Sequence, residues 1–520
     1  MGKVGNRWIA VAALATLLSS IGSALGEEGS AGVAGEPKEI TPTPGQVIVL
    51  SLQESILLGL KNNLAIAIEG FNPKIRAADV TGAKAVFDPT TFAEVSFDDR
   101  REQNRNVLVG APVRDNEDFN FSVGLRQDLP TGGSYELLFA NNRNFNNAQF
   151  FNPMGIDLQT AYSSELSLTV VQPLLKNFGV DINRTQIKIA ENEREISLDR
   201  FRETTMDVIT EVQIAYWDLV FALENLKVEQ RSLGLAKELA ELNRARVRAG
   251  VAAPVEITQA EADVAAREAV VTAAEKQMRD AEDRLKVVLN IPQGGEWGGA
   301  VLPTDPARFS AVTLNLAGAV ADALRKRPEY EVAKVDLSNR ELDFRLARNQ
   351  LLPDLSFQGS VGLNGLSARD PSYKDAVDDM TSGDFYSYSA GLVFSVPLGN
   401  RAARADFIKA QLGVEQARVS LRNLELEITA QVREAVRRIE RDAKLVEETR
   451  VARLLREEQL RIERKRLEAG VSTTFEVLRF QRDLSVAQSA EVRAMTDYNQ
   501  AIANLDRVRG VALEKHRIRM

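Results

Sequence analysis

Segments in which apolar and polar side chains alternate recur in both halves of the chain. In residues 386–396 every second position carries an apolar side chain: Tyr386, Tyr388, Ala390, Leu392, Phe394 and Val396. Residues 93–98, 166–170 and 355–363 alternate similarly. Strands of about ten residues can cross a bilayer when tilted, with the apolar face towards lipid and the small or polar face towards water. The same alternation suits a soluble β-sandwich, so the pattern alone leaves both interpretations open.

A further alternating pair predicts an extra hairpin within residues 120–142. Residues 121–125 and 135–139 alternate, and they flank the turn sequence Pro130-Thr131-Gly132-Gly133. The sequence leaves open whether this hairpin lies outside a barrel or extends its strands.

Between these segments the hydrophobic spacing becomes that of very long helices. Residues 183–249 and 401–469 contain no proline and one glycine each. At about 1.5 Å per residue each would span roughly 100 Å, so each needs partners along its whole length, as in coiled coils. Both end at an Ala-Gly-Val turn, where Gly250 and Gly470 are expected in the left-handed conformation. Shorter helices, 256–289 and 476–508, are expected to follow.

The two turns belong to an internal repeat. Residues 244–257 and 464–477 share six of fourteen positions at an offset of 220, and Pro-Leu landmarks at 173 and 397 precede them in the same order. We therefore expect repeats at 50–290 (helix, β-hairpin region 90–175, helical hairpin with its tip near 250) and 314–510 (helix, β-hairpin 353–398, helical hairpin with its tip near 470). A linker, 291–313, separates them. Residues 27–49 read as an irregular leader and 511–520 as a basic tail.

The N-terminus and the composition indicate an exported envelope protein. Residues 1–26 read as a signal peptide, with Lys3 and Arg7 before an apolar run that ends in small residues. The full chain carries a formal charge of −8, and the chain without this segment would be near −10. An acidic chain without a basic patch is a poor nucleic-acid binder, so no nucleic-acid partner is expected. The chain contains no cysteine, which excludes disulfides and thiol chemistry.

Catalytic chemistry finds little support in the sequence. His516 is the only histidine, and no phosphate-binding glycine loop is present. We therefore predict a protein that is not an enzyme, with no catalytic, cofactor-binding or metal-binding residues. A helical envelope scaffold and a carboxylate-only hydrolase remain as alternative functions.

The duplicated order of helix, proline, strands, Pro-Leu, long helix and Ala-Gly-Val turn resembles the TolC-type outer-membrane efflux proteins, from about residue 50 to residue 509. The resemblance implies a mixed α and β fold and a homotrimer. Each protomer would give four strands to a 12-stranded transmembrane β-barrel, continuous with a periplasmic coiled-coil barrel. It also implies a passive outer-membrane channel that extends into the periplasm and serves efflux or type I secretion. Its partners would be an inner-membrane transporter, a periplasmic adaptor and outer-membrane lipid.

The resemblance also assigns residues to sites at the helix-hairpin tips. Residues that match the adaptor-docking tips are Arg246, Gly250, Val251, Arg466, Gly470 and Val471. Glu476 matches an acid of the periplasmic constriction. Three residues later this chain has Arg479 where well-known members carry a second acid, so an Arg479–Glu ion pair is expected to hold the closed state. Glu256 is the corresponding acid of the first tip. Both acids also stand in first helical turns, where the helix dipole favours them.

Overall fold

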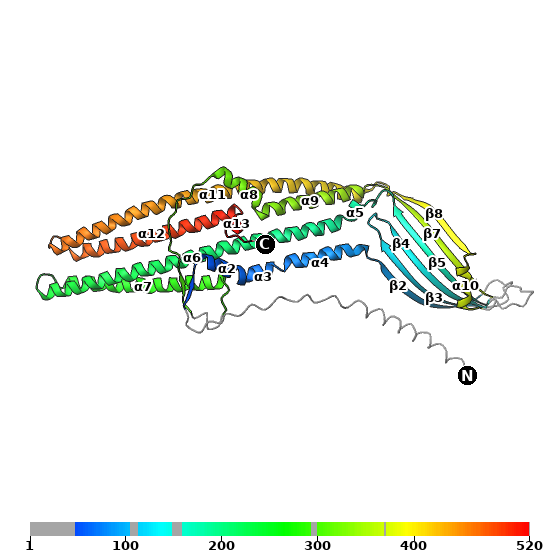
Figure 1. The fold of residues 1–520 in the computed structure, drawn as a ribbon, viewed down its shortest axis with the longest axis horizontal. Coiled ribbons are helices and arrows are strands. Elements are labelled where there is room, and N and C mark those ends of the chain that lie inside the picture. The colour runs from blue at the N-terminus through cyan, green and yellow to red at the C-terminus, as the bar shows by residue number, and fades with distance from the viewer. Residues whose placement is uncertain (1–46, 104–112, 148–158, 293–298, 369–370, 519–520) are drawn as a thin grey trace, which may run out of the picture.

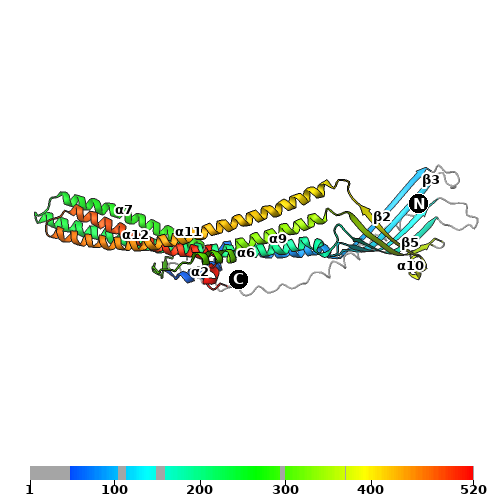
Figure 2. The same ribbon diagram turned by 90° about the horizontal axis from the view of Figure 1, so that it is seen from above.

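The structure is a computed structural model that describes residues 47–103, 113–147, 159–292, 299–368 and 371–518. The predicted signal peptide and all but the end of the predicted leader lie outside the described residues. The molecule is a long rod with one β-sheet at one end and two helical-hairpin tips at the other (Figure 1; Figure 2).

The sheet at the end of the rod contains six antiparallel strands. Their spatial order is β2-β3-β4-β5-β7-β8. Their bounds are Thr90–Gln103, Val113–Asp128, Ser134–Asn146, Thr160–Pro173, Asp354–Ser367 and Tyr386–Ser395. The sheet therefore contains two strands more than the four per protomer that the family resemblance implies for the barrel. The hairpin β3–β4 lies between β2 and β5. Strand β3 pairs with β2, and β4 pairs with β5, along nearly the full strand length.

A short helix between β7 and β8 was not expected from the sequence. This helix, α10 (Tyr373–Ser382), begins at Ser372, whose side chain caps the backbone N–H of Asp375. It packs against β7 and β5. Gly365 permits this contact, because a Cβ there would clash with the backbone of Ala376 and Met380.

Four helices make the two helical hairpins. The first hairpin joins α6 (Thr185–Arg248) to α7 (Val255–Val288), and the second joins α11 (Arg401–Glu468) to α12 (Thr474–Val508). Their ends lie within two residues of the expected positions. The 64 residues of α6 and the 68 of α11 correspond to about 100 Å each.

Shorter helices cover the part of the rod nearest the sheet. They are α2 (Leu52–Asn62), α3 (Leu64–Glu69), α4 (Asn72–Lys84), α8 (Leu316–Lys326) and α9 (Pro328–Asn349). Here α4 packs on α6, α6 on α9, and α9 on α11. In this half of the rod, α4 and α11 are therefore the two lateral edges of the helical layer. A turn η1 (Ala85–Phe87) and the helices α5 (Val180–Asn183) and α13 (Ala512–Lys515) complete the described helices.

The predicted irregular leader and linker contribute a short sheet. Strand β1 (Ile48–Leu50) pairs in parallel with β6 (Val301–Pro303). Leu50 is buried in a hydrophobic cluster with Tyr216 of α6, and the Tyr216 hydroxyl lies 3.3 Å from the Leu50 carbonyl oxygen. The end of the leader thus forms a strand whose last residue, Leu50, completes the core around α6.

Three hydrophobic clusters hold the helices together. The first joins α6, α7 and α2 around Val212, Leu285 and Ile56. The second joins α11, α12 and α8 around Ile428, Tyr498 and Ala323. The third lies near the tips and joins both hairpins: Leu239, Leu460, Leu467, Val477, Leu478 and Leu484. Burial of these side chains stabilises each hairpin and also docks the two hairpins on one another.

Candidate functional site: the hairpin tips and the contacts that join them

The two tips have the same backbone geometry. Gly250 and Gly470 have φ values of 77° and 74°, the left-handed conformation expected at a helix C-terminus. The next residue in each turn donates its N–H back to the helix: Val251 to the Arg246 carbonyl at 3.0 Å, and Val471 to the Arg466 carbonyl at 2.9 Å. The Val251 and Val471 side chains point away from the core, with 67% and 65% of their surface exposed. The tips thus present two apolar side chains to solvent.

The predicted gate pair lies within one helix. Arg479 Nη2 is 2.8 Å from Glu476 Oε2, one turn apart on α12, and both side chains are partly exposed. Arg466 likewise pairs with Glu463 of its own helix at 3.0 Å. The partly exposed Glu476–Arg479 pair contributes about 0–1 kcal/mol, whereas the Glu463 side chain is only 7% exposed. Within this chain, neither ion pair joins two helices.

Glu256 is placed differently, because it connects the two tips. The Thr474 hydroxyl of α12 lies 2.8 Å from Glu256 Oε2 and 3.1 Å from Asn243 Oδ1 of α6. Thr474 and Asn243 are both buried. A first-turn carboxylate of the first hairpin thus accepts a hydrogen bond from the first residue of α12.

An ionic cluster, buried except for Arg482, lies about two and a half turns beyond these tips. Asp263 and Arg267 of α7 are only 5% and 8% exposed, and Arg267 Nε donates to Asp263 Oδ2 at 2.6 Å. The second Asp263 oxygen accepts from Arg482 Nη2 of α12 at 2.9 Å. We call Asp263, Arg267 and Arg482 the clasp.

The clasp reaches all three neighbouring helices. Besides its pairing with Asp263, Arg267 donates to the Ser232 hydroxyl of α6 and, at 3.4 Å, to the Leu478 carbonyl of α12. Burial makes the removal of one partner costly, since the charge left behind has neither water nor its counter-ion. The clasp therefore fixes α12 against α6 and α7 at one position.

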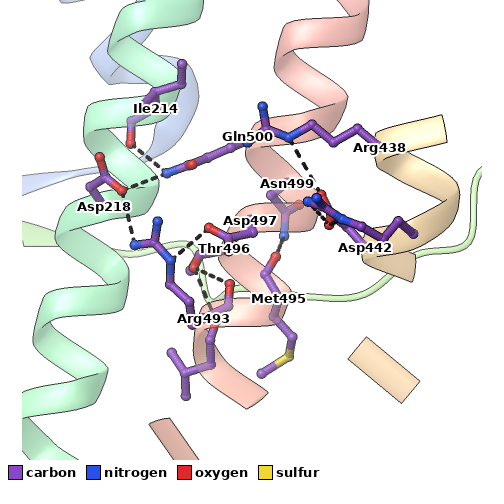
Figure 3. A network of polar contacts seen from close by, with 12 residues as sticks. Ile214, Asp218, Arg438, Asp442, Arg493, Met495, Thr496, Asp497, Asn499 and Gln500 are labelled. Carbon is purple, nitrogen blue, oxygen red and sulfur yellow. Dashed lines mark hydrogen bonds and ion pairs between the residues drawn. The ribbon is translucent and has the colours of Figure 1, made fainter. Parts of the chain in front are cut away.

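Further polar contacts continue from the clasp along α6 and α12. Ser485 donates to Glu229 at 3.1 Å, and Ser489 donates to Asn225 at 2.6 Å. Farther from the tips, Gln500 Nε2 donates to Asp218 at 2.8 Å (Figure 3). We call this line of contacts between α6 and α12 the seam.

Figure 3 shows how the seam is built at its middle. Arg493 of α12 extends towards Asp218 of α6, at 3.7 Å, and also pairs with Asp497 of its own helix at 2.9 Å. On the other side of α12, Asp442 of α11 is buried and lies 3.9 Å from Arg438. The seam thus runs between the two hairpins. Helix α12 packs against α11 within its own hairpin and against α6 of the first hairpin.

One carboxyl near the sheet-side end of the seam has a shifted pKa. Burial, reinforced by the nearby carboxylates of Glu329 and Asp207, raises the pKa of Glu203 on α6 to about 6. The guanidinium groups of Arg507 and Arg327 act in the opposite direction. This carboxyl therefore gains a proton on mild acidification.

The sequence showed only part of this site. The resemblance assigns Glu256 to the aperture, whereas in the structure Glu256 joins the two tips through Thr474. The sequence does not predict the clasp. Its only sequence signal is the i,i+4 spacing of Asp263 and Arg267, which is common on solvated helix faces. The connection to Arg482 depends on how two hairpins more than 200 residues apart dock.

Two features are absent from the described part of the chain. No group of three or more acidic or histidine side chains is placed to hold a metal ion there. None of its helices combines the length and the apolar character needed to span a membrane.

Comparison with known proteins identifies the family. The model of the family "Outer membrane efflux protein" matches residues 140–290 and 319–511. Among curated proteins, the chain is 24% identical over 421 residues to the pyoverdine export outer membrane protein OpmQ of Pseudomonas putida, covering 79% of this chain and 81% of that protein. It is 24% identical over 345 residues to nodulation protein T of Rhizobium leguminosarum bv. trifolii, covering 66% and 70%.

Solved structures share the fold. The outer membrane channel MtrE of Neisseria gonorrhoeae superposes with a TM-score of 0.62 at 18% identity, covering 94% of this chain and 97% of that one. The CmeC outer membrane channel of Campylobacter jejuni gives 0.61 at 16% identity, covering 89% and 86%. The family and the fold are those of outer-membrane channels that extend into the periplasm, as the sequence predicted. The chain belongs to the outer membrane efflux protein family.

Proposed function

We propose that this chain is one subunit of a homotrimeric channel that gives passive exit to substrates delivered by an inner-membrane transporter and a periplasmic adaptor. The observation that carries the proposal is the pair of open lateral edges on a chain of this family. Among the described residues, β2 and β8 each have one strand neighbour in the sheet, and all ten residues of β8 are exposed. Unpaired strand edges of this length are templates for another chain.

The helical layer supports the same closure. Strand β2 follows α4 and β8 precedes α11, so the edges of the sheet continue as the edges of the helical layer. Both helical edges expose apolar side chains. They are Ile68, Phe71 and Ile75 on or beside α3 and α4, and Ile408, Leu412, Val419 and Leu426 on α11. Burial of these side chains against a second and third copy would close a tube of helices on a barrel of strands.

The two faces of the sheet suit a water-filled barrel in lipid. One face carries Val95, Phe121, Leu168 and Leu392, and the other carries Glu94, Ser122, Thr169 and Gly391. Outer-membrane barrels place the apolar face towards lipid and the polar face towards the lumen. The two halves of the chain would each provide strands and one helical hairpin, as the sequence repeat predicts.

At the far end, the tips would dock the adaptor. Arg246, Gly250 and Val251 of the first tip, and Arg466, Gly470 and Val471 of the second, form two similar turns with an exposed valine each. Two equivalent turns per chain would offer six similar sites in a trimer. Each valine offers apolar area, and the neighbouring arginines favour an acidic partner surface.

Near these tips, the clasp and the Glu256–Thr474 contact would hold the hairpins in the closed state. Opening of a helical tube requires hairpins to move apart, and these contacts join α12 to the first hairpin. Glu476 and Arg479 would line the aperture without locking it. The inner-membrane transporter would select the substrate, whether a drug or a protein.

Planar-bilayer recording of the purified protein tests the proposal. We expect a detergent-dependent trimer that conducts ions after reconstitution. A protein that stays soluble without detergent and gives no conductance would instead favour a structural scaffold and would overturn the channel.

A further inference from the structure

We infer that the β3–β4 hairpin belongs to the wall of the channel, so that three copies of this chain close an 18-stranded barrel. The inference rests on the proposed trimeric channel and departs from the 12 strands that the family resemblance implies. Its basis is how the hairpin pairs, faces and docks within the sheet.

The extra strands continue the sheet without interruption. Fourteen residue pairs join β2 to β3, and twelve join β4 to β5, each ladder as long as the strands of the expected barrel. One row runs across all six strands through paired residues: Ala93, Val123, Phe139, Leu166, Leu363 and Tyr386. A hairpin outside the barrel would leave β2 and β5 as direct neighbours, which this register excludes within the chain.

The faces of β3 and β4 match those of the other strands. The row above is apolar throughout. A second row, three residues along each strand from the first and on the opposite face, is polar throughout: Thr90, Arg126, Glu136, Thr169, Ser360 and Ser389. Because side chains alternate between faces, a hairpin folded into the lumen or away into water would not need this pattern on both strands.

Hydrogen bonds on the polar face also connect the extra strands to β2. Asn142 donates to Asn120 at 2.6 Å, and Asn120 donates to Ser96 at 3.2 Å. Asn144 donates to Asp118 at 2.6 Å. These side chains form a polar ladder on the face that would line water.

The turn of the hairpin is fixed at the junction of sheet and helices. The Gly179 N–H donates to the Thr131 carbonyl at 3.0 Å, and the Thr131 hydroxyl donates to Gln172 Oε1 at 2.9 Å. Gly132 has a φ of 91°, and a Cβ there would clash with the Asn177 carbonyl. The turn therefore lies at the same level as the helix-side ends of β5 and β2, and the extra strands cross with their neighbours.

The strand count remains even, which is what closure requires. Strand β2 leads away from the helices and β8 leads back to them, so β8 of one copy runs antiparallel to β2 of the next. Barrel diameter grows roughly in proportion to strand number, and barrels of 16–18 strands leave an open aqueous channel. The membrane section would thus be about half again as wide as a 12-stranded one. Passage of bulky solutes would then be limited by the helical tube and its tips.

Disulfide trapping in the membrane-inserted trimer tests the strand order, because the chain has no cysteine of its own. Ala93→Cys/Val123→Cys and Phe139→Cys/Leu166→Cys place thiols on neighbouring strands, within disulfide reach. Ala93→Cys/Leu166→Cys separates them by three strand spacings, roughly 14 Å. Leu363→Cys/Tyr386→Cys is the matched control, since β7 and β8 are neighbours in either barrel.

We expect the first two pairs and the control to oxidise and the Ala93/Leu166 pair to stay reduced. Oxidation of the Ala93/Leu166 pair, or failure of the first two pairs while the control oxidises, would overturn the 18-stranded barrel. Conductance recorded on the same preparations separates this result from failure of the channel proposal, since a conducting trimer with displaced β3 and β4 would keep the channel.

A deletion of residues 113–146 tests the width of the membrane barrel. It joins β2 to β5 at their far ends and leaves four strands per chain. Neutral polymers added on the outer side should enter the intact barrel up to a larger size than they enter the deletion variant. Equal size limits in two conducting trimers would overturn the wider barrel.

Discussion

The two helical hairpins share a turn, a length and a sequence motif, yet they bury one corresponding position differently. Asp263 of the first hairpin and Asp483 of the second stand 220 residues apart, the offset of the two tips. Asp263 is 5% exposed and bonds to Arg267 and Arg482. Asp483 is 38% exposed and lies 3.5 Å from Arg456 of its own hairpin. The same carboxylate is thus an inter-hairpin contact in one repeat and a surface ion pair in the other, because α12 packs against α6 as well as α11.

The largest difference is expected when each aspartate loses an arginine. Arg267→Met leaves Asp263 buried with only Arg482, and we expect it to destabilise the tip-proximal part of α7 by about 3 kcal/mol. Hydrogen exchange of the α7 amides measures the change. Arg456→Met is the matched control, expected at about 0–1 kcal/mol because its ion pair is partly exposed. Equal effects of the two substitutions would contradict the comparison.

The Glu256–Thr474 contact should come next in size. Thr474→Val keeps the shape of the side chain but leaves Glu256 and Asn243 without the donor, so a loss of about 1–2 kcal/mol is expected. Exchange at the first turns of α7 and α12 reports it. Thr449→Val, on an exposed hydroxyl bonded within α11, serves as the control and should change stability by less than about 0.5 kcal/mol. If exchange at α7 stays unchanged in Thr474→Val, the contact does not join the tips.

Where the hairpins are alike, equal effects are expected. Gly250→Ala and Gly470→Ala each force a Cβ into the left-handed region, at about 1 kcal/mol. Both glycines have open space around them, so backbone strain is the cause of the loss. Thermal unfolding of the two variants should shift by the same amount. A clear inequality would show that the tips differ in some way that their shared turn geometry does not reveal.

The smallest expected effect concerns pH. The pKa of Glu203 is raised to about 6, so the stability linked to its protonation is fully present below pH 4.5 and is lost as the pH rises through 6. Glu203→Gln should remove this slope. We therefore expect the stability difference between variant and wild type to be larger at pH 7 than at pH 4.5, in favour of the variant. Unfolding curves at the two pH values check the sign, and a pH-independent difference would contradict it.

The long helices and their turns could be predicted from sequence because they depend on local signals. Absence of proline, helical spacing and a glycine at each C-terminus placed the ends of α6 and α11 within two residues. The strand count depended on more than local signals. Local alternation predicts the hairpin at 120–142, but it does not say which strands become neighbours, so the insertion of this hairpin between β2 and β5 could not be predicted. Strand β1 could not be predicted because its partner β6 lies more than 250 residues away in the sequence.

In the candidate site, too, the features that depend on local sequence could be predicted, and the contacts between distant segments could not. The turns at Gly250 and Gly470 were visible because left-handed glycines have a recognisable sequence context. The Glu476–Arg479 pair was visible as an i,i+3 spacing, and it forms within α12. The clasp was not visible, since identical Asp and Arg residues occur on many exposed helix faces, and only the docking of α12 on α6 and α7 buries Asp263 and Arg267 and brings Arg482 to them.

The most direct test compares the single-channel conductance of two double variants in planar bilayers. Arg267→Met/Arg482→Met removes both cations of the clasp, and Glu476→Ala/Arg479→Ala removes the ion pair that lies within α12. If the inter-hairpin contacts hold the closed state, the first variant conducts clearly more than wild type and the second differs little. A second variant that opens the channel while the first leaves it closed would contradict the account and return the gate to Glu476 and Arg479.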